Sequence, residues 1–249
     1  MNARPLILAG GFVGLWQMLV SLSGVPAYIL PGPLPVAQAL ASHAPQLLGH
    51  TGATLAEILL GLVLGAVLGA GAALVMILSP LLKRWMLPLL VVSQAIPVFA
   101  LAPLLVLWLG YGLASKVAMA VLIIFFPVTT AFYGGMRRVD PDLLELARIM
   151  GAKPWAVLTA IVIPSALPGL ASGLRVATAV APIGAVIGEW VGASSGLGFY
   201  MLHANARMQI DVMFAALTVL AAISLLLYFL VDRLLDRLIF WQPQQGLLQ

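Results

Sequence analysis

Residue types that could do chemistry are few and scattered in this chain of 249 residues. It has 0 Cys, which excludes disulfides, cysteine nucleophiles and cysteine-ligated metals, and its 3 His have no metal-ligand spacing. Every lysine follows a residue other than glycine, so the Gly-Lys step of a phosphate-binding loop is missing and the chain is not expected to hydrolyse ATP. We therefore predict a chain that is not an enzyme and that uses no cofactor and no metal.

Arg175 and Glu189 are ionisable residues within one apolar stretch, where a charge is costly and therefore a candidate for function. In a helix, the 14 positions between them place both on nearly the same face but roughly 21 Å apart along the axis, so they cannot pair. Arg175 is expected near the inner end of its helix, against a lipid phosphate or a backbone carbonyl. Glu189 is expected near the outer interface, with a gating or docking role. We expect Glu57 to be a solvated helix end, and His43 and His50 to face solvent.

The composition is that of a membrane protein, because 63% of the residues are hydrophobic and 8% are charged, whereas soluble domains have about 25% charged residues. A soluble enzyme is thereby excluded. A helix crosses the hydrocarbon core in about 20 residues, and lipid forces the backbone to satisfy its own hydrogen bonds. The charge-free runs predict six spanning helices, at residues 5–22, 53–79, 86–109, 114–135, 167–191 and 212–231. The expected fold class is an all-α, polytopic membrane protein, with one transmembrane domain over residues 1–249.

The basic residues predict the orientation, because cytoplasmic loops are enriched in Lys and Arg. With these spans, most basic residues fall on one side: Arg4, Lys83, Arg84, Arg137, Arg138, Arg148, Lys153, Arg233 and Arg237. Lys116 and Arg207 fall on the other side. Both termini are then expected to be cytoplasmic. The net charge of +4 thus reflects membrane topology, and no nucleic-acid partner is expected.

The first apolar run has two interpretations. It could be a secretory signal peptide, because Arg4 precedes it, or an uncleaved anchor, which we favour since it closes the topology with an even number of spans. Residues 23–52 are rich in Pro and Gly and are expected to form an outer loop. Within that loop, Pro35 permits a short helix on the membrane surface.

Small residues four positions apart let helices approach closely in a membrane. This spacing occurs at Gly61, Gly65 and Gly69, at Gly169 and Gly173, and at Gly184 and Gly188. We favour packing within the chain, and a dimer face is the alternative.

Prolines interrupt several predicted spans and free backbone carbonyls, which are tolerated where a polar cavity or a neighbour satisfies them. Polar side chains lie close to these prolines and predict a translocation path. The candidates are Ser93, Gln94, Pro97, Thr130, Thr178, Pro182 and Glu189. Alternatively, the hydroxyl groups simply donate to carbonyls of their own helices.

The segment 137–164 is the long hydrophilic insert on the basic side. Asp140 is a good N-cap, Pro141 suits the first helical position, and Gly151 can adopt the left-handed conformation that ends a helix. Leu143, Ala147 and Met150 would share one face of this helix. An exposed apolar face at such a place indicates a partner.

This insert resembles the loop of permease subunits from ATP-binding-cassette (ABC) importers, which has the motif E-A-A, three residues, G, nine residues, I-x-L-P. Glu145, Ala147, Gly151, Ile161 and Pro164 match at that spacing, whereas Leu146 and Ile163 are apolar replacements. The resemblance implies a type I importer permease fold in which Glu145, Leu146, Ala147, Gly151, Ile161 and Pro164 couple the chain to a cytoplasmic ATPase subunit. It also implies a soluble substrate-binding protein and a homodimer of permeases, embedded in the lipid of a bacterial plasma (inner) membrane.

Two further stretches, 93–103 and 188–192, are similar to the nitrate/sulfonate/taurine permease group. Residues 203–209 resemble the branch that imports hydroxymethylpyrimidine-type thiamine precursors. A sulfonate, taurine or nitrate importer is the alternative within the family. An ion-coupled secondary transporter is the alternative class, although no 3+3 repeat is evident. A membrane-embedded enzyme would need a cluster of acid/base or metal residues.

Overall fold

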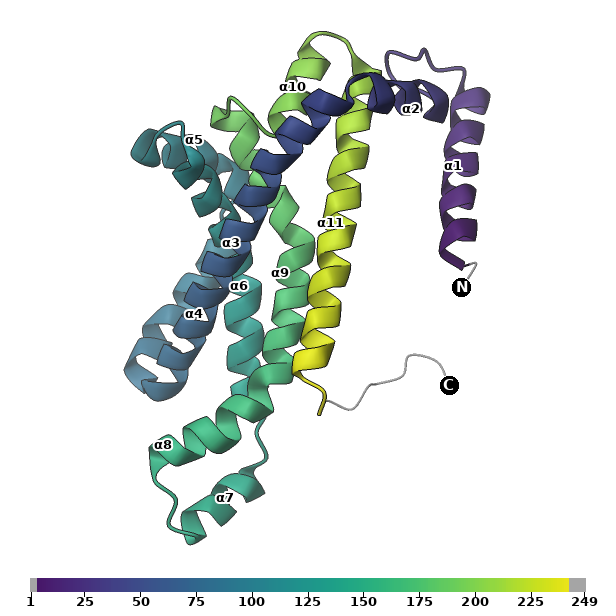
Figure 1. The fold of residues 1–249 in the computed structure, drawn as a ribbon. Coiled ribbons are helices and arrows are strands. Elements are labelled where there is room, and N and C mark those ends of the chain that lie inside the picture. The colour runs from purple at the N-terminus through teal and green to yellow at the C-terminus, as the bar shows by residue number, and fades with distance from the viewer. Residues whose placement is uncertain (1–3, 242–249) are drawn as a thin grey trace.

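The computed structural model describes residues 4–241, with side chains from residue 10 onward, and this part of the chain is helical without strands. Figure 1 shows the arrangement. The helices are α1 (Arg4–Ser23), α2 (Pro33–Ser42), α3 (Ala44–Leu78), α4 (Pro80–Ala95), α5 (Val98–Leu109), α6 (Leu113–Arg137), α7 (Pro141–Ile149), α8 (Pro154–Val157), a π-helical turn (Leu158–Val162), α9 (Ile163–Gly192), α10 (Leu197–Ala206) and α11 (Ile210–Leu238).

Helix α6 packs between α3 and α9, and the glycine pattern explains how. A Cβ atom added to Gly65 of α3 would lie 2.6 Å from the Ile124 side chain of α6, and one added to Gly173 of α9 would lie 2.8 Å from the Pro127 carbonyl oxygen of α6. Any larger residue would therefore push the helices apart. The glycines serve packing within the chain, as favoured from the sequence, and the dimer-face alternative is wrong at these positions.

Four helical stretches are long and apolar enough to cross a membrane among the described residues: Ala44–Leu78, Leu113–Arg137, Pro154–Gly192 and Ile210–Leu238. Helices α4 and α5 are apolar enough together to add a fifth span. They meet at an angle of 102°, so this span would be a broken one. The span count thus differs from the six expected. Pro97 stands at the start of α5 and breaks the run 86–109, while the apolar part of α1, Gly10–Ser23, is shorter than a full span.

Helix α1 lies at the edge of the bundle, next to α2, and it also contacts α11 (Figure 1). Trp16 ties it down: its indole nitrogen donates to the carbonyl of Pro31 over 3.1 Å, and its ring stacks on Phe214 of α11. The short helix expected after Pro35 exists as α2. It does not only rest on a membrane surface, because Val36 is buried in a cluster with residues of α10 and α11.

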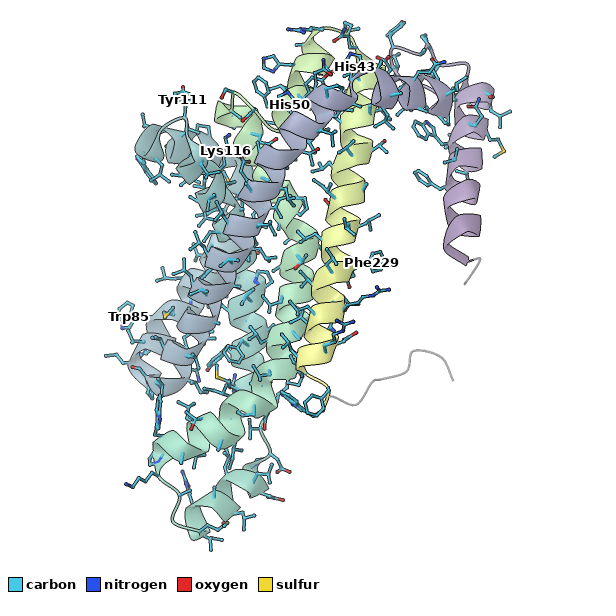
Figure 2. All side chains as sticks on the ribbon, viewed as in Figure 1. His43, His50, Trp85, Tyr111, Lys116 and Phe229 are labelled. Atoms are coloured by element: carbon cyan, nitrogen blue, oxygen red, sulfur yellow. The ribbon has the colours of Figure 1, made fainter. Side chains whose placement is uncertain are left out.

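The two ends of the bundle differ in charge. The Lys83 ammonium and the Arg137 guanidinium group both lie 5.9 Å from the centre of the Tyr133 ring, so the basic residues around α4 and α6 gather at the end that bears α7. The first turn of α1 and the last turn of α11 point toward this same end, whereas Lys116 and His50 lie toward the other (Figures 1 and 2). We call these the α7 end and the α10 end.

Candidate functional site

Helix α7 has the two boundaries that the sequence predicts. Asp140 Oδ1 accepts a hydrogen bond from the backbone N–H of Asp142 over 3.0 Å, and Pro141 is the first helical residue. At the other end Gly151 has a φ of +74°, and the backbone N–H of Ala152 donates to the carbonyl of Ala147 over 2.9 Å. This left-handed stop leaves α7 as a short, independently capped helix.

The surface of α7 is largely uncovered. Ala147 is buried, but Leu146, Ile149 and Met150 are 53%, 78% and 77% exposed. On one side, Glu145 and Ile149 help to line a shallow groove of about 610 Å³. Of the three residues expected to share one apolar face, Ala147 is buried, whereas Leu143 and Met150 are 47% and 77% exposed and stay open to a partner within the described residues.

The segment after α7 leads back into the bundle as a long helical stretch. Pro154 begins α8, and helical backbone continues from Pro154 through the π-helical turn and α9 to Gly192. The other motif residues, Ile161 and Pro164, lie in this rod and are partly buried. One continuous helical stretch thus leads from Pro154, shortly after α7, to the α10 end.

The candidate path residues divide into two groups. Ser93 and Gln94 are exposed at the end of α4, immediately before the bend at Pro97, and Ser93 Oγ donates to the Leu90 carbonyl over 2.8 Å. Thr178 and Pro182 are instead buried in the bundle.

The two threonines among the path candidates bond to the backbone of their own helices. Thr130 Oγ1 donates to the Phe126 carbonyl over 2.9 Å, and Thr178 Oγ1 donates to the Leu174 carbonyl over 2.7 Å. These contacts agree with the alternative interpretation, in which the hydroxyl groups satisfy carbonyls of their own helices. In this conformation they present no free hydroxyl proton to a cavity.

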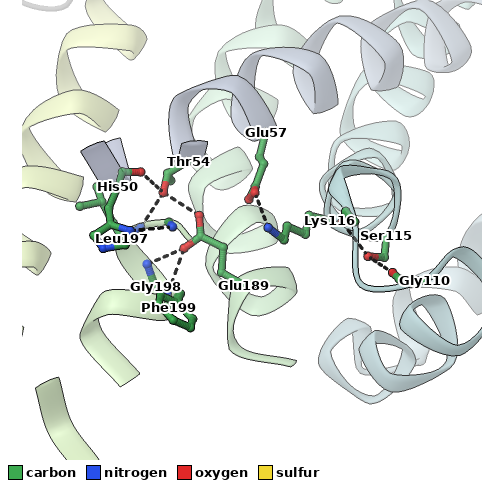
Figure 3. Close-up of polar contacts among 12 residues, drawn as sticks. His50, Thr54, Glu57, Gly110, Ser115, Lys116, Glu189, Leu197, Gly198 and Phe199 are labelled. Carbon is green, nitrogen blue, oxygen red and sulfur yellow. Dashed lines mark hydrogen bonds and ion pairs between the residues drawn. The ribbon is translucent and has the colours of Figure 1, made fainter. Parts of the chain in front are cut away.

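Glu189 is buried at the α10 end, and its carboxylate caps a helix (Figure 3). Its Oε2 accepts from the backbone N–H groups of Gly198 and Phe199, at the first turn of α10, and its Oε1 accepts from Thr54 Oγ1 over 2.6 Å. Thr54 in turn accepts from the N–H of Leu197 over 2.7 Å. A helix N-terminus leaves N–H groups unpaired and carries partial positive charge, which this carboxylate satisfies. Glu189 thus lies at the end opposite α7, as expected, and its side chain is buried in this cap; a gating or docking role stays a prediction.

His50 also belongs to this cluster and does not simply face solvent. Its Nδ1 accepts from the N–H of Gly196 over 3.1 Å, and its ring stacks on Tyr200 with the ring centres 4.8 Å apart. Burial raises the pKa of Tyr200 above its ordinary value. Together with Thr54 and Glu189, His50 fastens the start of α10 to α3 and α9.

Glu57 is not a solvated helix end. Its Oε1 lies 3.0 Å from the Lys116 ammonium, and the side chains of both residues are almost completely buried between α3 and α6 (Figure 3). The sequence shows that each of these charged residues borders an apolar stretch. It does not indicate that the two form an ion pair.

Arg175 is also paired. Its Nε lies 2.5 Å from Asp232 and its terminal nitrogen 2.6 Å from Asp236, one turn apart on α11. Arg175 therefore joins α9 to α11. The expectation that it contacts a lipid phosphate or a backbone carbonyl is wrong, because its partners are these two carboxylates.

The helical architecture and the capped loop helix describe a membrane transport subunit. Residues 47–240 match the family described as "Binding-protein-dependent transport system inner membrane component", and the chain belongs to this family. The resemblance inferred from the loop motif is thereby confirmed, and the ion-coupled and enzymatic alternatives are not supported.

Comparison with relatives supports the same class. A "Probable ABC transporter permease protein" of Haemophilus influenzae is 54% identical, covering 95% of this chain and 97% of the relative. The "Riboflavin transport system permease protein RibX" of Chloroflexus aurantiacus is 41% identical over 91% and 85%. The "Formylaminopyrimidine transport permease protein ThiX" of Halalkalibacterium halodurans is 37% identical over 93% and 92%. The chain is thus an ABC importer permease subunit, and its relatives are named as permeases rather than ATPases.

More distant relatives include permeases named for aliphatic sulfonates in Bacillus subtilis, at 30% identity, and for taurine in Escherichia coli, at 31%. Among solved structures, inward-facing MetNI, a methionine ABC transporter, aligns with a TM-score of 0.68 at 21% identity, covering 79% of this chain and 97% of that one. This likeness confirms the type I permease fold. The relatives agree on the class of protein and differ in the substrate that their names give.

Proposed function

We propose that this chain is a single permease domain that passes a pyrimidine-type thiamine precursor from a soluble binding protein to the cytoplasm. Two copies would form the conduit, with α7 on the cytoplasmic side and both termini facing the cytoplasm. A separate ATPase subunit would dock on α7 and drive the transition between inward and outward states.

The observation that carries this proposal is the exposed, doubly capped α7. A helix of 9 residues with uncovered apolar side chains would not be stable alone in water, and here Asp140 and Gly151 fix both of its ends. Glu145, Leu146, Ala147 and Gly151 place the loop motif on this helix and its stop. A groove on an ATPase that accepted α7 would move the rod from Pro154 to Gly192 as one body.

The bend between α4 and α5 supports a conduit between two copies. Non-helical backbone at membrane depth is tolerated where it is buried by protein or lines a water-filled cavity. Ser93, Gln94 and Pro97 lie at this bend and are exposed in the single chain. A second copy facing the bend would enclose these polar groups, so we retain them as path residues.

The named relatives favour a heterocyclic substrate. The relatives at 41% and 37% identity are named for riboflavin and formylaminopyrimidine, both aromatic nitrogen heterocycles. Those named for sulfonates and taurine are at 28–31%. A sulfonate or taurine importer is the alternative that this difference disfavours.

Uptake measurements test the substrate. Cells that lack this permease, but retain its binding protein and ATPase, would be complemented with the chain and given radiolabelled hydroxymethylpyrimidine or taurine. We expect saturable, ATP-dependent uptake of the pyrimidine only. Taurine uptake without pyrimidine uptake would refute the substrate, and uptake that persists without the ATPase would refute the mechanism.

A further inference from the structure

A pocket of about 340 Å³ opens at the α10 end, between the end of α9, the start of α10 and the loop before α6. It is lined by Tyr111, Glu189, Trp190, Val191, Gly192, Ala193, Ser194, Phe199, Leu202 and His203. The volume lies at the lower end of the range of small-molecule sites. The location is opposite to α7, on the side from which the proposed function delivers substrate.

Aromatic rings form much of the pocket wall. Trp190 is 51% exposed and Tyr111 is 81% exposed. Phe199 and His203 pack against each other with ring centres 4.0 Å apart. Rings of this kind bind flat ligands by stacking.

The wall offers no free charge to an anion. Among the described residues that line the pocket, none is Lys or Arg. The first N–H groups of α10, which could otherwise hold an anion, already donate to Glu189 and Thr54. The Glu189 carboxylate is buried and already accepts three hydrogen bonds, so it offers little free charge to a cationic ligand.

The Phe199 and His203 side of the aromatic wall is held by several contacts. Glu189 fixes the backbone of Phe199, and His203 Nδ1 lies 3.1 Å from the Phe199 carbonyl oxygen. His50 supports Phe199 from α3, with ring centres 5.9 Å apart. A preformed surface binds a rigid ligand with little loss of conformational entropy.

We propose that this pocket is a substrate site on the permease itself for an uncharged, single-ring aromatic nitrogen heterocycle, which contacts the rings of Trp190, Tyr111 and Phe199. The site would receive the ligand after its release from the binding protein. The proposal rests on the proposed function, and it adds a place of recognition that excludes sulfonates and other anions.

Binding of radiolabelled hydroxymethylpyrimidine to the full-length permease in lipid nanodiscs, without binding protein, tests this site. Stacking on one aromatic side chain typically changes affinity by about tenfold or more. We therefore expect Trp190→Ala to weaken binding at least about tenfold and Trp190→Phe to restore most of it. Trp85→Ala is the matched control, because Trp85 is 68% exposed on α4, toward the α7 end. Excess taurine should not compete.

Absence of binding to the wild-type permease, unchanged affinity in Trp190→Ala or equal competition by taurine would each overturn the site. Retained co-purification with the ATPase checks that Trp190→Ala is folded. Uptake by the complete importer separates the two proposals. If wild-type cells import the pyrimidine and Trp190→Ala leaves the KM of uptake unchanged, the pocket is refuted and the proposed substrate stands. If wild-type cells do not import it, the proposed substrate fails.

Discussion

Glu57 and Lys116 form an ion pair with 3.0 Å between Oε1 and Nζ, and their side chains are only 1% and 8% exposed. The pair joins α3 to α6 at the α10 end, next to the Glu189 cap (Figure 3). The second oxygen of Glu57, Oε2, has no hydrogen-bond partner among the described residues. Glu57 therefore depends on Lys116 for the compensation of its buried charge.

Removal of one partner should be far worse than removal of both. Lys116→Met leaves the Glu57 carboxylate buried and uncompensated, a change that typically costs about 3–5 kcal/mol. The double variant Glu57→Leu/Lys116→Met should regain much of this loss, because no buried charge remains. Thermal unfolding of the purified permease in detergent measures the difference. Equal destabilisation in single and double variants would contradict the pairing.

The Glu189 cap should control the order of α10. Glu189→Ala removes the acceptor of the Gly198 and Phe199 amides, and the loss of an N-cap costs roughly 1–2 kcal/mol. Hydrogen exchange at the start of α10 should accelerate by about tenfold or more. Glu145→Ala, which removes an exposed acid on α7, is the matched control and should leave exchange in α10 unchanged. Equal exchange in wild type and Glu189→Ala would show that α10 does not need this cap.

Contacts within a few residues could be predicted from the sequence, and contacts between distant helices could not. Asp140 and Gly151 define α7 through bonds to backbone groups close by, so their roles follow from local rules. Glu189 bonds to Thr54 at a separation of 135 residues, and Arg175 to Asp232 at 57. The apolar pattern does not specify which long helices become neighbours, so the sequence indicated costly charges without their partners.

The number of spanning helices among the described residues, four or five, differs from the six predicted because packing between helices also decides whether a proline breaks a span. Hydrophobicity alone treats residues 86–109 as one run, whereas Pro97 cannot supply a backbone N–H and starts a new helix at 102° to the first. Pro127 and Pro182, in contrast, remain inside uninterrupted helices. Local sequence does not distinguish these cases, because the neighbouring helices determine whether a proline is accommodated.

The left-handed stop at Gly151 should be necessary for ATPase association. Gly151→Val forces a β-branched residue into a φ of +74°, which costs about 1–2 kcal/mol and favours continuation or fraying of α7. We expect roughly tenfold less ATPase to co-purify. Gly110→Val is the matched control, since Gly110 also has a positive φ, +81°, and open space around it, but lies before α6 at the other end. Equal loss of ATPase in the two variants would attribute the effect to general misfolding.

The exposed apolar side chains of α7 should supply the binding energy for the ATPase. Ile149 is 78% exposed, so Ile149→Asp is expected to change the stability of the permease by less than about 0.5 kcal/mol. If the side chain enters a groove on the ATPase, a charge there should weaken association by about 2 kcal/mol or more, which is roughly thirtyfold. Titration of the ATPase onto the nanodisc-embedded permease measures this affinity. Leu107→Asn, at an equally exposed position on α5, should leave ATPase affinity at the wild-type value. Wild-type affinity in Ile149→Asp, with uptake also intact, would remove α7 as the docking element, because a buried docking face does not tolerate a new charge at its centre.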